Sequence, residues 1–494
     1  GFNVILSPRT NKQTIHKGVE GTVAESCFPV KVAHGQVLSL LERDDVDYIF
    51  FPSVIGMEKD DADYQNYYLC PYVQTTPYLV SAALNMPEGK FLRPVVTFTR
   101  GRSVLLESLV AFARQFGKSA SEVDRALDVA ERTQSAFRSA MVKRGQEILE
   151  TLSEQQRAVV IVSRVYNGCD PGINLGLPQI LRDLGVLAIP MDFLPIQDVK
   201  VGDDWTNMFW KYGQRILKAG KFIRNHPQLN ALYITNFSCG PDSFLTTYFK
   251  KVMGEKPALT IEIDEHSAPA GAITRCEAFL DSLDNIKGRT YSVYERTFGK
   301  DVPASIKGRK LYIPYMGDHA YSLAAGLRGL GIPAEVFGFS DRESVEVGRQ
   351  FTTGKECYPL IVTTGDMVKK TREPGFDPAK SAFFMPSGTG PCRFGQYNLF
   401  QRLVMQELGH EIPIFAPNQD VNFYKEVGSE FAKVACIGMV GGALLYKALY
   451  DTRPYEVNAG ETNSAYQRAL RHFGDALEQR KNPYAALAEC ADMF

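Results

Sequence analysis

The chain has 494 residues, of which 45% are hydrophobic and 22% charged, and its formal net charge is −1. These values are typical of soluble globular proteins, and the length exceeds one ordinary core, so we expect two to four domains. The near-zero charge excludes a module that works mainly by binding nucleic acid or anionic lipid. No run approaches the roughly 20 apolar residues that a membrane helix needs, so we expect no membrane association.

Short β-rich apolar runs alternate with helical patterns along the whole chain, which predicts α/β domains on parallel, Rossmann-like (flavodoxin-like) sheets. The opening residues predict a turn leading straight into a strand, as in the middle of a domain, and no signal peptide. The first block has expected strands at 3–6, 48–52 and 94–98 and helices at 105–116 and 123–152.

Two further blocks follow the same rhythm. Expected strands of the second lie at 158–162, 187–190, 231–234 and 259–263. Those of the third lie at 310–314, 334–337, 382–385 and 412–415, before a helical tail at 461–494. We therefore predict three α/β domains, at residues 1–155, 156–305 and 306–494.

The first and third blocks form an internal repeat. At one constant spacing, Gly18 matches Gly348, Thr22 matches Thr352, Cys27 matches Cys357, Pro29 matches Pro359 and Gly35 matches Gly365. Matched glycines and a matched Cys-aromatic-Pro make chance improbable. The third block opens with a strand and helix, residues 310–331, that the first lacks. We expect the first copy to miss one βα unit at its front and the chain to belong to a longer polypeptide.

The nine cysteines, in a chain without a secretion signal, predict free thiols in a reducing, cytoplasmic setting. Ligands of parallel sheets gather where strands end and helices begin, and helix N-termini favour anions such as a thiolate-bound cluster. Five cysteines lie at such turns: Cys27, Cys70, Cys239, Cys357 and Cys392. We predict that they bind metal, against the alternative that each is a small buried side chain.

The other four cysteines fit this pattern less well. Cys276 lies inside a helical pattern and Cys436 has apolar flanks, so both are expected in the core, although Cys436 is the most plausible sixth ligand. Cys169 could be a ligand, and Cys490 is expected to be an exposed thiol. Zinc is the rival metal, but its structural sites use close pairs such as C-x2-C, which the sequence lacks.

Three polar residues, Asp264, Glu265 and His266, follow directly after the strand expected at 259–263. Glu265 and His266 are candidate catalytic residues, with His266 as proton donor, and the alternative is an ordinary helix cap with Asp264. Lys31, four residues after Cys27, either neutralises cluster charge or is a surface lysine. His34 is expected in the core.

These motifs make the sequence familiar. A resemblance to a known family rests on several segments: 25–31 with His34-Gly35, Cys70-Pro71, 167–178, 236–244, 264–271, 274–281, 390–397 and 453–456. In these segments the chain resembles the 2-hydroxyacyl-CoA dehydratase and benzoyl-CoA reductase subunit family. The chain more closely resembles the region after the ATPase domains of large acyl-CoA dehydratase activase-related proteins.

The resemblance implies Rossmann-like domains around a 4Fe–4S cluster held by three cysteines, which by position are Cys27, Cys70 and Cys239. A related branch carries a double-cubane 8Fe–9S cluster on six cysteines, which Cys357, Cys392 and Cys436 would complete. The implied partner is a dimeric ATPase activator with its own 4Fe–4S cluster, separate or fused upstream.

The expected function is an ATP-dependent, low-potential reductase component that receives electrons from the activator and reduces a small-molecule substrate. Two alternatives stay open: a 2-hydroxyacyl-CoA dehydratase-type radical enzyme subunit, and a non-enzymatic iron–sulfur scaffold or electron-transfer protein. A homo-oligomer is compatible with each. The substrate is not indicated.

Overall fold

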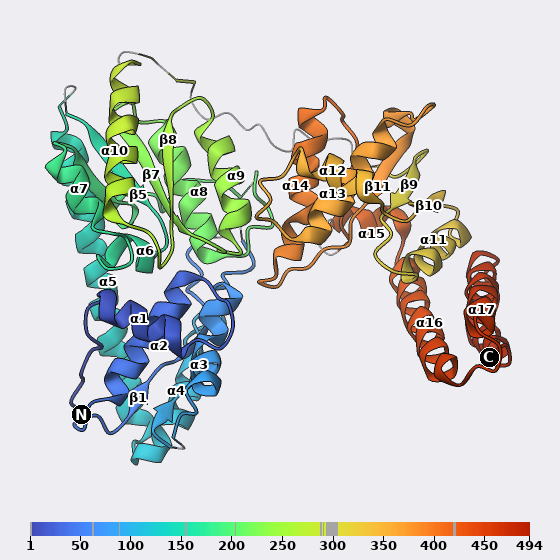
Figure 1. Ribbon diagram of the computed structural model, residues 1–494, viewed down its shortest axis with the longest axis horizontal. Coiled ribbons are helices and arrows are strands. Elements are labelled where there is room, and N and C mark those ends of the chain that lie inside the picture. Colours follow the sequence, from blue (N-terminus) through green and yellow to red (C-terminus); the bar gives the residue numbers. More distant parts are fainter. Residues whose placement is uncertain are drawn as a thin grey trace. The chain divides into compact units, whose positions relative to one another are not determined.

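The computed structural model describes residues 2–61, 64–87, 89–153, 156–202, 204–286, 289, 291–292, 305–417 and 421–494. Its contacts divide the chain into two compact units, shown in Figure 1: Gly1–Thr297 with Gly390–Cys392, and Phe298–Thr389 with Arg393–Phe494. All pairs between named strands are parallel, which confirms the predicted α/β class. A boundary at residue 155 within the first unit stays a prediction.

The larger sheet of the first unit has the strand order β6-β5-β7-β8. Its strands are β5 (Ala158–Val162), β6 (Leu187–Pro190), β7 (Leu229–Asn236) and β8 (Ala258–Ile263). Helices α7 (Leu177–Asp183) and α10 (Pro269–Asp284) cover one face, and α8 (Lys211–Arg224) and α9 (Asp242–Met253) pack together on the strands of the other. All five residues of β5 are buried, because both faces of a parallel sheet are covered by helices.

The first block of this unit has two parallel strand pairs, β1–β3 and β2–β4. The strands are β1 (Ile49–Phe50), β2 (Ser53–Gly56), β3 (Phe91–Leu92) and β4 (Val95–Thr97). The helices are α1 (Lys12–Gly21), α2 (Phe28–Leu41), α3 (Pro71–Ala83), α4 (Arg102–Ala113) and α5 (Ala120–Thr151), and short α6 (Val165–Cys169) follows β5. The strand predicted at 3–6 is wrong, because these residues pair with no strand and are mostly exposed.

The second unit has the strand order β10-β9-β11-β12. Its strands are β9 (Lys310–Ile313), β10 (Ala334–Val336), β11 (Ser381–Phe384) and β12 (Ile414–Phe415). Its helices are α11 (His319–Gly329), α12 (Arg342–Arg349), α13 (Tyr358–Thr371), α14 (Tyr397–Glu407), α15 (Val421–Val427), α16 (Glu430–Thr452), α17 (Glu461–Glu478) and α18 (Pro483–Ala491). Short 3-10 turns lie at η1 (Arg114–Phe116), η2 (Met191–Phe193), η3 (Pro378–Lys380), η4 (Arg393–Gln396) and η5 (Arg453–Tyr455).

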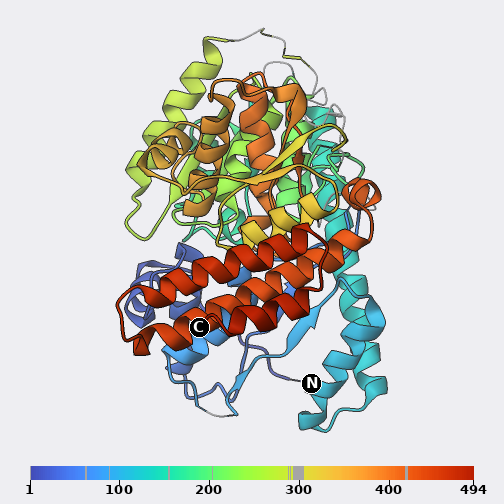
Figure 2. The same ribbon diagram turned by 90° about the vertical axis from the view of Figure 1, so that its right-hand side faces the viewer.

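The expectation that no segment is long and apolar enough to cross a membrane is wrong for helix α16. Within the described part of the chain, the helical stretch Glu430–Tyr455 is long and apolar enough to cross a membrane, although none was expected. Length and composition do not distinguish such a helix from the core helix of a soluble protein. Here α16 packs beside α17, as Figure 2 shows, and also contacts α11. Gly441 admits the ring of Phe473, since an added Cβ would lie 2.2 Å from that ring.

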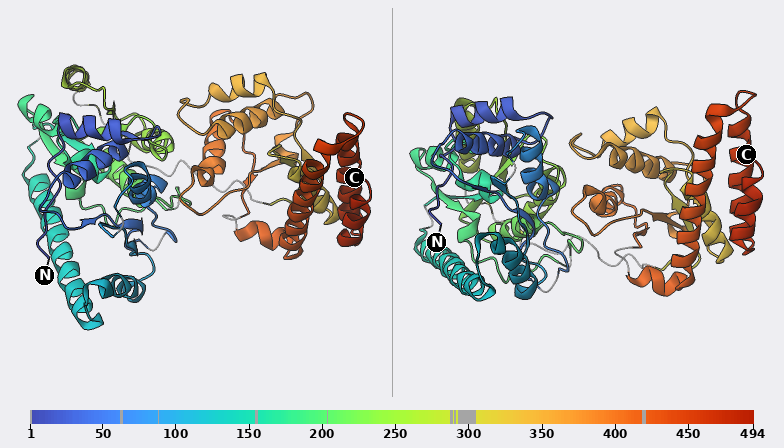
Figure 3. Two further views of the ribbon diagram at one scale, coloured as in Figure 1. Left: turned by 60° about the horizontal axis from the view of Figure 1, so that its bottom comes forward. Right: turned by 90° about the horizontal axis from the view of Figure 1, so that it is seen from below.

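The predicted internal repeat is present in the packing of two helix pairs, α1 with α2 and α12 with α13 (Figure 3). A Cβ on Gly18 would lie 2.0 Å from the carbonyl oxygen of Lys31, and a Cβ on Gly348 1.9 Å from that of Ile361. The backbones therefore approach at equivalent positions of the two copies, which only glycine permits.

The helix caps repeat as well. Asn11 accepts the Thr14 amide N–H at the start of α1, and Asp341 accepts the Ser344 amide N–H at the start of α12. Cys27 and Cys357, which the sequence aligns, are the residues immediately before α2 and α13. The repeat thus extends from the caps to the candidate cysteines.

Candidate functional site

Cys27 lies at the N-terminal end of α2, where Pro29 supplies the fixed φ that suits a first helical turn. The next residue, Phe28, is buried in the core beneath the larger sheet of the first unit. Burial raises the pKa of the Cys27 thiol to about 11, and Cys70 adds to the rise, while the Val30 N–H and Arg164 oppose it. Cys27 is therefore a sheltered thiol next to Cys70.

Cys70 occupies the same position on α3, with Pro71 following it. Its Sγ accepts the amide N–H of Val73 at 3.5 Å, so the free N–H groups of the helix end face this sulfur. The preceding loop is joined to the start of α8 by two backbone bonds at Tyr68, which donates to Phe209 O at 2.8 Å and accepts from Lys211 N at 2.9 Å.

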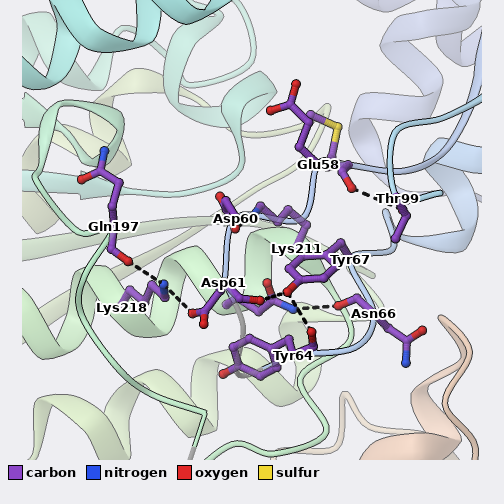
Figure 4. A network of polar contacts seen from close by, with 12 residues as sticks. Glu58, Asp60, Asp61, Tyr64, Asn66, Tyr67, Thr99, Gln197, Lys211 and Lys218 are labelled. Atoms are coloured by element: carbon purple, nitrogen blue, oxygen red, sulfur yellow. Dashed lines mark hydrogen bonds and ion pairs between the residues drawn. The ribbon is translucent and has the colours of Figure 1, made fainter. Parts of the chain in front are cut away.

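A network of polar contacts fastens the segment before Cys70 to α8 (Figure 4). The buried Asp61 carboxylate pairs with Lys218 Nζ at 2.6 Å, and Lys218 also donates to the carbonyl of Gln197 at 3.1 Å. Gln214 donates to the carbonyl of Asn66 at 2.9 Å. These contacts bury both charges as a pair, so they fix the position of the loop that ends in Cys70.

Cys239 lies in the turn between β7 and α9, at the carboxyl edge of the larger sheet. Its carbonyl accepts the Ser243 N–H at 3.1 Å, which places it at the start of α9. Burial raises the pKa of the Cys239 thiol, with Asp242 and Cys27 adding to the rise and Arg164 opposing it. Cys27, Cys70 and Cys239 therefore neighbour one another, although they come from three separate turns.

Arg164 is the residue at this site that the sequence analysis missed. It follows β5, is only 4% exposed, and pairs through Nη2 with Asp242 Oδ1 at 2.6 Å. Its Nη1 lies 3.3 Å from both Cys239 Sγ and the Tyr166 hydroxyl. Burial alone would lower the pKa of Arg164, but Asp242 and the thiols raise it well above its usual value. The site thus has a permanent, buried positive charge.

The arrangement does not fit a single metal ion. Within the described part of the chain, no three His, Cys, Asp or Glu side chains are close enough to hold one ion. What the fold brings together is three half-buried thiols, two of them at helix N-termini, around one guanidinium.

The remaining predicted ligands belong to both units. Cys357 is in the second unit, at the start of α13 and partly exposed, and Cys392 is exposed in the short segment grouped with the first unit. Cys436, expected in the core, is exposed on α16. The prediction is wrong because glycines and leucines form the buried face of that helix.

The other cysteines also separate by burial. Cys276 is buried in α10, as predicted, and Cys169 is exposed at the end of α6. Cys490, predicted to be exposed, is fully buried and its Sγ donates to the carbonyl of Ala469 at 3.3 Å. That prediction is wrong because α18 packs against α17.

The two predicted catalytic residues, Glu265 and His266, lie in different environments. Glu265 pairs with Lys31, which is buried and also lies 2.6 Å from Glu25. Burial would raise the pKa of Glu265, but the contact with Lys31 lowers it. His266 is largely exposed, with its ring 3.9 Å from Asp264. His34 is buried and its Nδ1 lies 2.8 Å from Val30 O, which confirms a core role. A catalytic role for Glu265 or His266 stays a prediction.

Comparison with known proteins gives one match. Residues 1–194 match the family model described as CoA enzyme activase uncharacterised domain. Over these residues the chain is similar to that family, which fits the expected likeness to activase-related proteins. The match includes Cys27, Cys70 and Arg164 and ends before Cys239. No curated protein and no solved structure matches the chain.

Proposed function

We propose that Cys27, Cys70 and Cys239 hold a 4Fe–4S cluster, and that the protein is the low-potential reductase component of an ATP-dependent system. One observation carries the proposal: three thiols from distant turns neighbour one another around the buried cation Arg164. Burying a charged pair such as Arg164 with Asp242 is costly, so a merely structural role for three small side chains would not require it. The guanidinium also donates to Cys239 Sγ, which directs its charge toward the thiols.

The donor set suits such a cluster. Thiolates are the usual ligands of iron–sulfur clusters, and each thiolate of a cubane binds a different iron, so three sulfurs need not converge on one ion. The raised pKa of Cys27 and Cys239 means that these thiols are protonated in the free protein at neutral pH. Loading the site would therefore release protons. When bound, the cluster would supply single-electron chemistry.

The residues of the chain have distinct tasks in this proposal. The N-termini of α2 and α3 direct backbone N–H groups and partial positive charge toward the sulfurs. Arg164 adds a full charge and donates to Cys239 Sγ, which stabilises negative charge there. Asp242 holds the guanidinium in place, and its own second oxygen accepts the Thr235 hydroxyl at 2.6 Å.

The proposed partner is a dimeric ATPase activator with its own 4Fe–4S cluster, and we place both in the cytoplasm. The match of residues 1–194 to a CoA enzyme activase domain supports a link with an acyl-CoA dehydratase system. The description of the matched family, a CoA enzyme activase domain, also favours a second candidate function, that of a 2-hydroxyacyl-CoA dehydratase-type subunit. A double-cubane cluster that also uses Cys357, Cys392 and Cys436 would favour the reductase instead.

The test is reduction of the anaerobically reconstituted protein by such an activator with ATP, followed by electron paramagnetic resonance. We expect an ATP-dependent signal from this chain that Cys239→Ser abolishes and Cys276→Ser retains, since Cys276 is buried away from the site in α10. A signal that survives Cys239→Ser would contradict the ligand assignment. A cluster that forms but never accepts electrons from the activator would contradict the reductase role.

A further inference from the structure

Two buried polar side chains beside the cysteine site have no hydrogen-bond partner. Within the described part of the chain, no group bonds to the hydroxyl of Ser26 or to either polar atom of the Asn167 amide. Ser26 is 9% exposed and Asn167 is 0% exposed. Buried polar atoms in folded proteins are almost always paired, because an unpaired one loses its bonds to water and gains none. Each of these groups therefore calls for a partner that the polypeptide does not supply.

Asn167 lies beside Arg164. It is the third residue of α6, and Arg164 is the residue that caps this helix. At such a helix start the side chain of the third residue reaches back toward the capping residue, and the Asn167 N–H donates to the Arg164 carbonyl at 3.0 Å. Helix α6 also contacts β7, the strand that leads to Cys239. The unpaired amide is therefore next to the residue whose guanidinium donates to Cys239 Sγ.

A second buried asparagine in the same region is fully paired. Asn174 is 1% exposed; its Nδ2 donates to the Gly168 carbonyl at 3.0 Å, and its Oδ1 accepts the Gly176 N–H at 3.0 Å. The segment that follows α6 thus satisfies one buried amide completely. The unpaired amide is the one nearer to Arg164 and the thiols.

The Tyr166 hydroxyl has a proton left to donate. Its oxygen accepts from Arg164 Nη1 at 3.3 Å, and the same nitrogen lies 3.3 Å from Cys239 Sγ. A tyrosine hydroxyl can donate as well as accept, and within the described residues its O–H has no acceptor. Burial raises the pKa of Tyr166, and Cys70 and Cys239 add to the rise against the effect of Arg164, so the phenol lies near both sulfurs.

Ser26 supplies a donor from a different turn. It directly precedes Cys27, the residue that caps α2, whereas Tyr166 and Asn167 belong to α6. Its hydroxyl oxygen is buried. The three uncommitted donors thus come from two separate turns and share the neighbourhood of the thiols.

We propose that the hydroxyls of Tyr166 and Ser26 and the amide N–H of Asn167 are hydrogen-bond donors to the sulfurs of the bound cluster, and that they raise its reduction potential. The inference rests on the proposed function, because the acceptors are sulfurs of a cluster held by the three cysteines. Hydrogen bonds to the sulfurs are among the properties that set the potential of an iron–sulfur cluster. Reduction adds negative charge, so a donor stabilises the reduced form more than the oxidised form.

The first experiment is a potentiometric titration of the anaerobically reconstituted protein without substrate, followed by electron paramagnetic resonance. Tyr166→Phe and Ser26→Ala each remove one O–H. We expect each to lower the equilibrium constant for reduction by about tenfold, the ratio that one hydrogen bond to a charged group supplies, or about 59 mV for one electron. The matched control is Tyr466→Phe, whose hydroxyl donates to Asp318 in the second unit, and it should leave the potential unchanged.

The outcomes separate this inference from the proposed function. Variants that keep their iron and have the potential of the unaltered chain overturn the inference and leave the cluster assignment intact. An unaltered chain that binds no cluster overturns the proposed function and this inference with it. Because substrate is absent, a shifted potential also excludes a substrate atom as the sole acceptor of these donors.

A second measurement keeps the test decisive if a variant fails to load iron. In the metal-free protein the Asn167 amide is unpaired, so we expect Asn167→Leu to raise the midpoint of urea unfolding. Asn174→Leu is the matched control and should lower the midpoint, since both of its bonds are lost. A metal-free Asn167→Leu protein that is destabilised like the control would show that the amide already has a partner in the polypeptide, which overturns the inference.

Discussion

Replacing Arg164 by methionine leaves the Asp242 carboxylate buried without its cation. The pair is deep in the first unit, with both side chains almost fully buried and Nη2 2.6 Å from Oδ1. The Thr235 hydroxyl, at 2.6 Å, would remain as a hydrogen-bond partner of Asp242. Methionine keeps much of the length of the side chain, so the variant removes charge more than volume.

The expected cost follows from that geometry. Removing one member of a buried ion pair costs about 3–5 kcal/mol, because the other charge is left uncompensated. Because the hydrogen bond from the Thr235 hydroxyl to Asp242 is retained, we expect a loss of about 3 kcal/mol. A domain stable by about 5–15 kcal/mol would still fold, with a clearly lower denaturation midpoint.

The assay is urea unfolding of the metal-free protein followed by tryptophan fluorescence. Both tryptophans, Trp205 and Trp210, are buried in the first unit, so the signal reports that unit alone. Arg102→Met is the matched control, since Arg102 also pairs with carboxylates but on the surface, and we expect it to leave the midpoint nearly unchanged. An Arg164→Met midpoint equal to that of the control would refute the reasoning.

Three further changes test the packing and the charges. Gly18→Ala and Gly348→Ala should each destabilise by about 1–3 kcal/mol in urea unfolding because the new methyl meets a backbone carbonyl, whereas Gly271→Ala, with open space around it, should not. Burial lowers the pKa of Lys256 from 10.5 to about 8, so the folded state binds fewer protons than the unfolded state between these values. Stability should therefore rise relative to Lys256→Met as pH increases from 8 to 10.5, and an equal difference at both ends would contradict this. Phe473→Ala, in the core of the C-terminal helices, should cost about 3–5 kcal/mol by calorimetry, and a loss under 1 kcal/mol would show that the site is loosely packed.

The sequence was sufficient for the α/β class because strand and helix periodicities are local properties. Every strand expected in the second and third blocks is present, and the glycines of the repeat meet the same carbonyl positions in both copies. The strand predicted at residues 3–6 was wrong because apolar strand-forming side chains still need a neighbouring strand to pair with.

The candidate site was predictable only in part. The rule that ligands gather at strand ends located Cys27, Cys70 and Cys239, but it was applied to cysteines alone and passed over Arg164 at the end of β5. The partner of Arg164, Asp242, is 78 residues away and adjacent only because β5 and β7 pair. Cys436 was misplaced because apolar neighbours in sequence do not tell which face of a helix is covered. Cys490 was misplaced because its place in the C-terminal tail does not tell that α18 packs against α17.

The most direct test of the central claim is iron and acid-labile sulfide per chain in strictly anaerobic protein, measured for the unaltered chain and for Cys27→Ser, Cys70→Ser, Cys239→Ser and Cys169→Ser. The account predicts about four irons and four sulfides, lost with each of the first three substitutions and kept with Cys169→Ser. About eight irons, reduced by Cys357→Ser or Cys392→Ser, would add the second cluster. Protein with no iron, with zinc in its place, or with iron indifferent to Cys27, Cys70 and Cys239 would contradict the account.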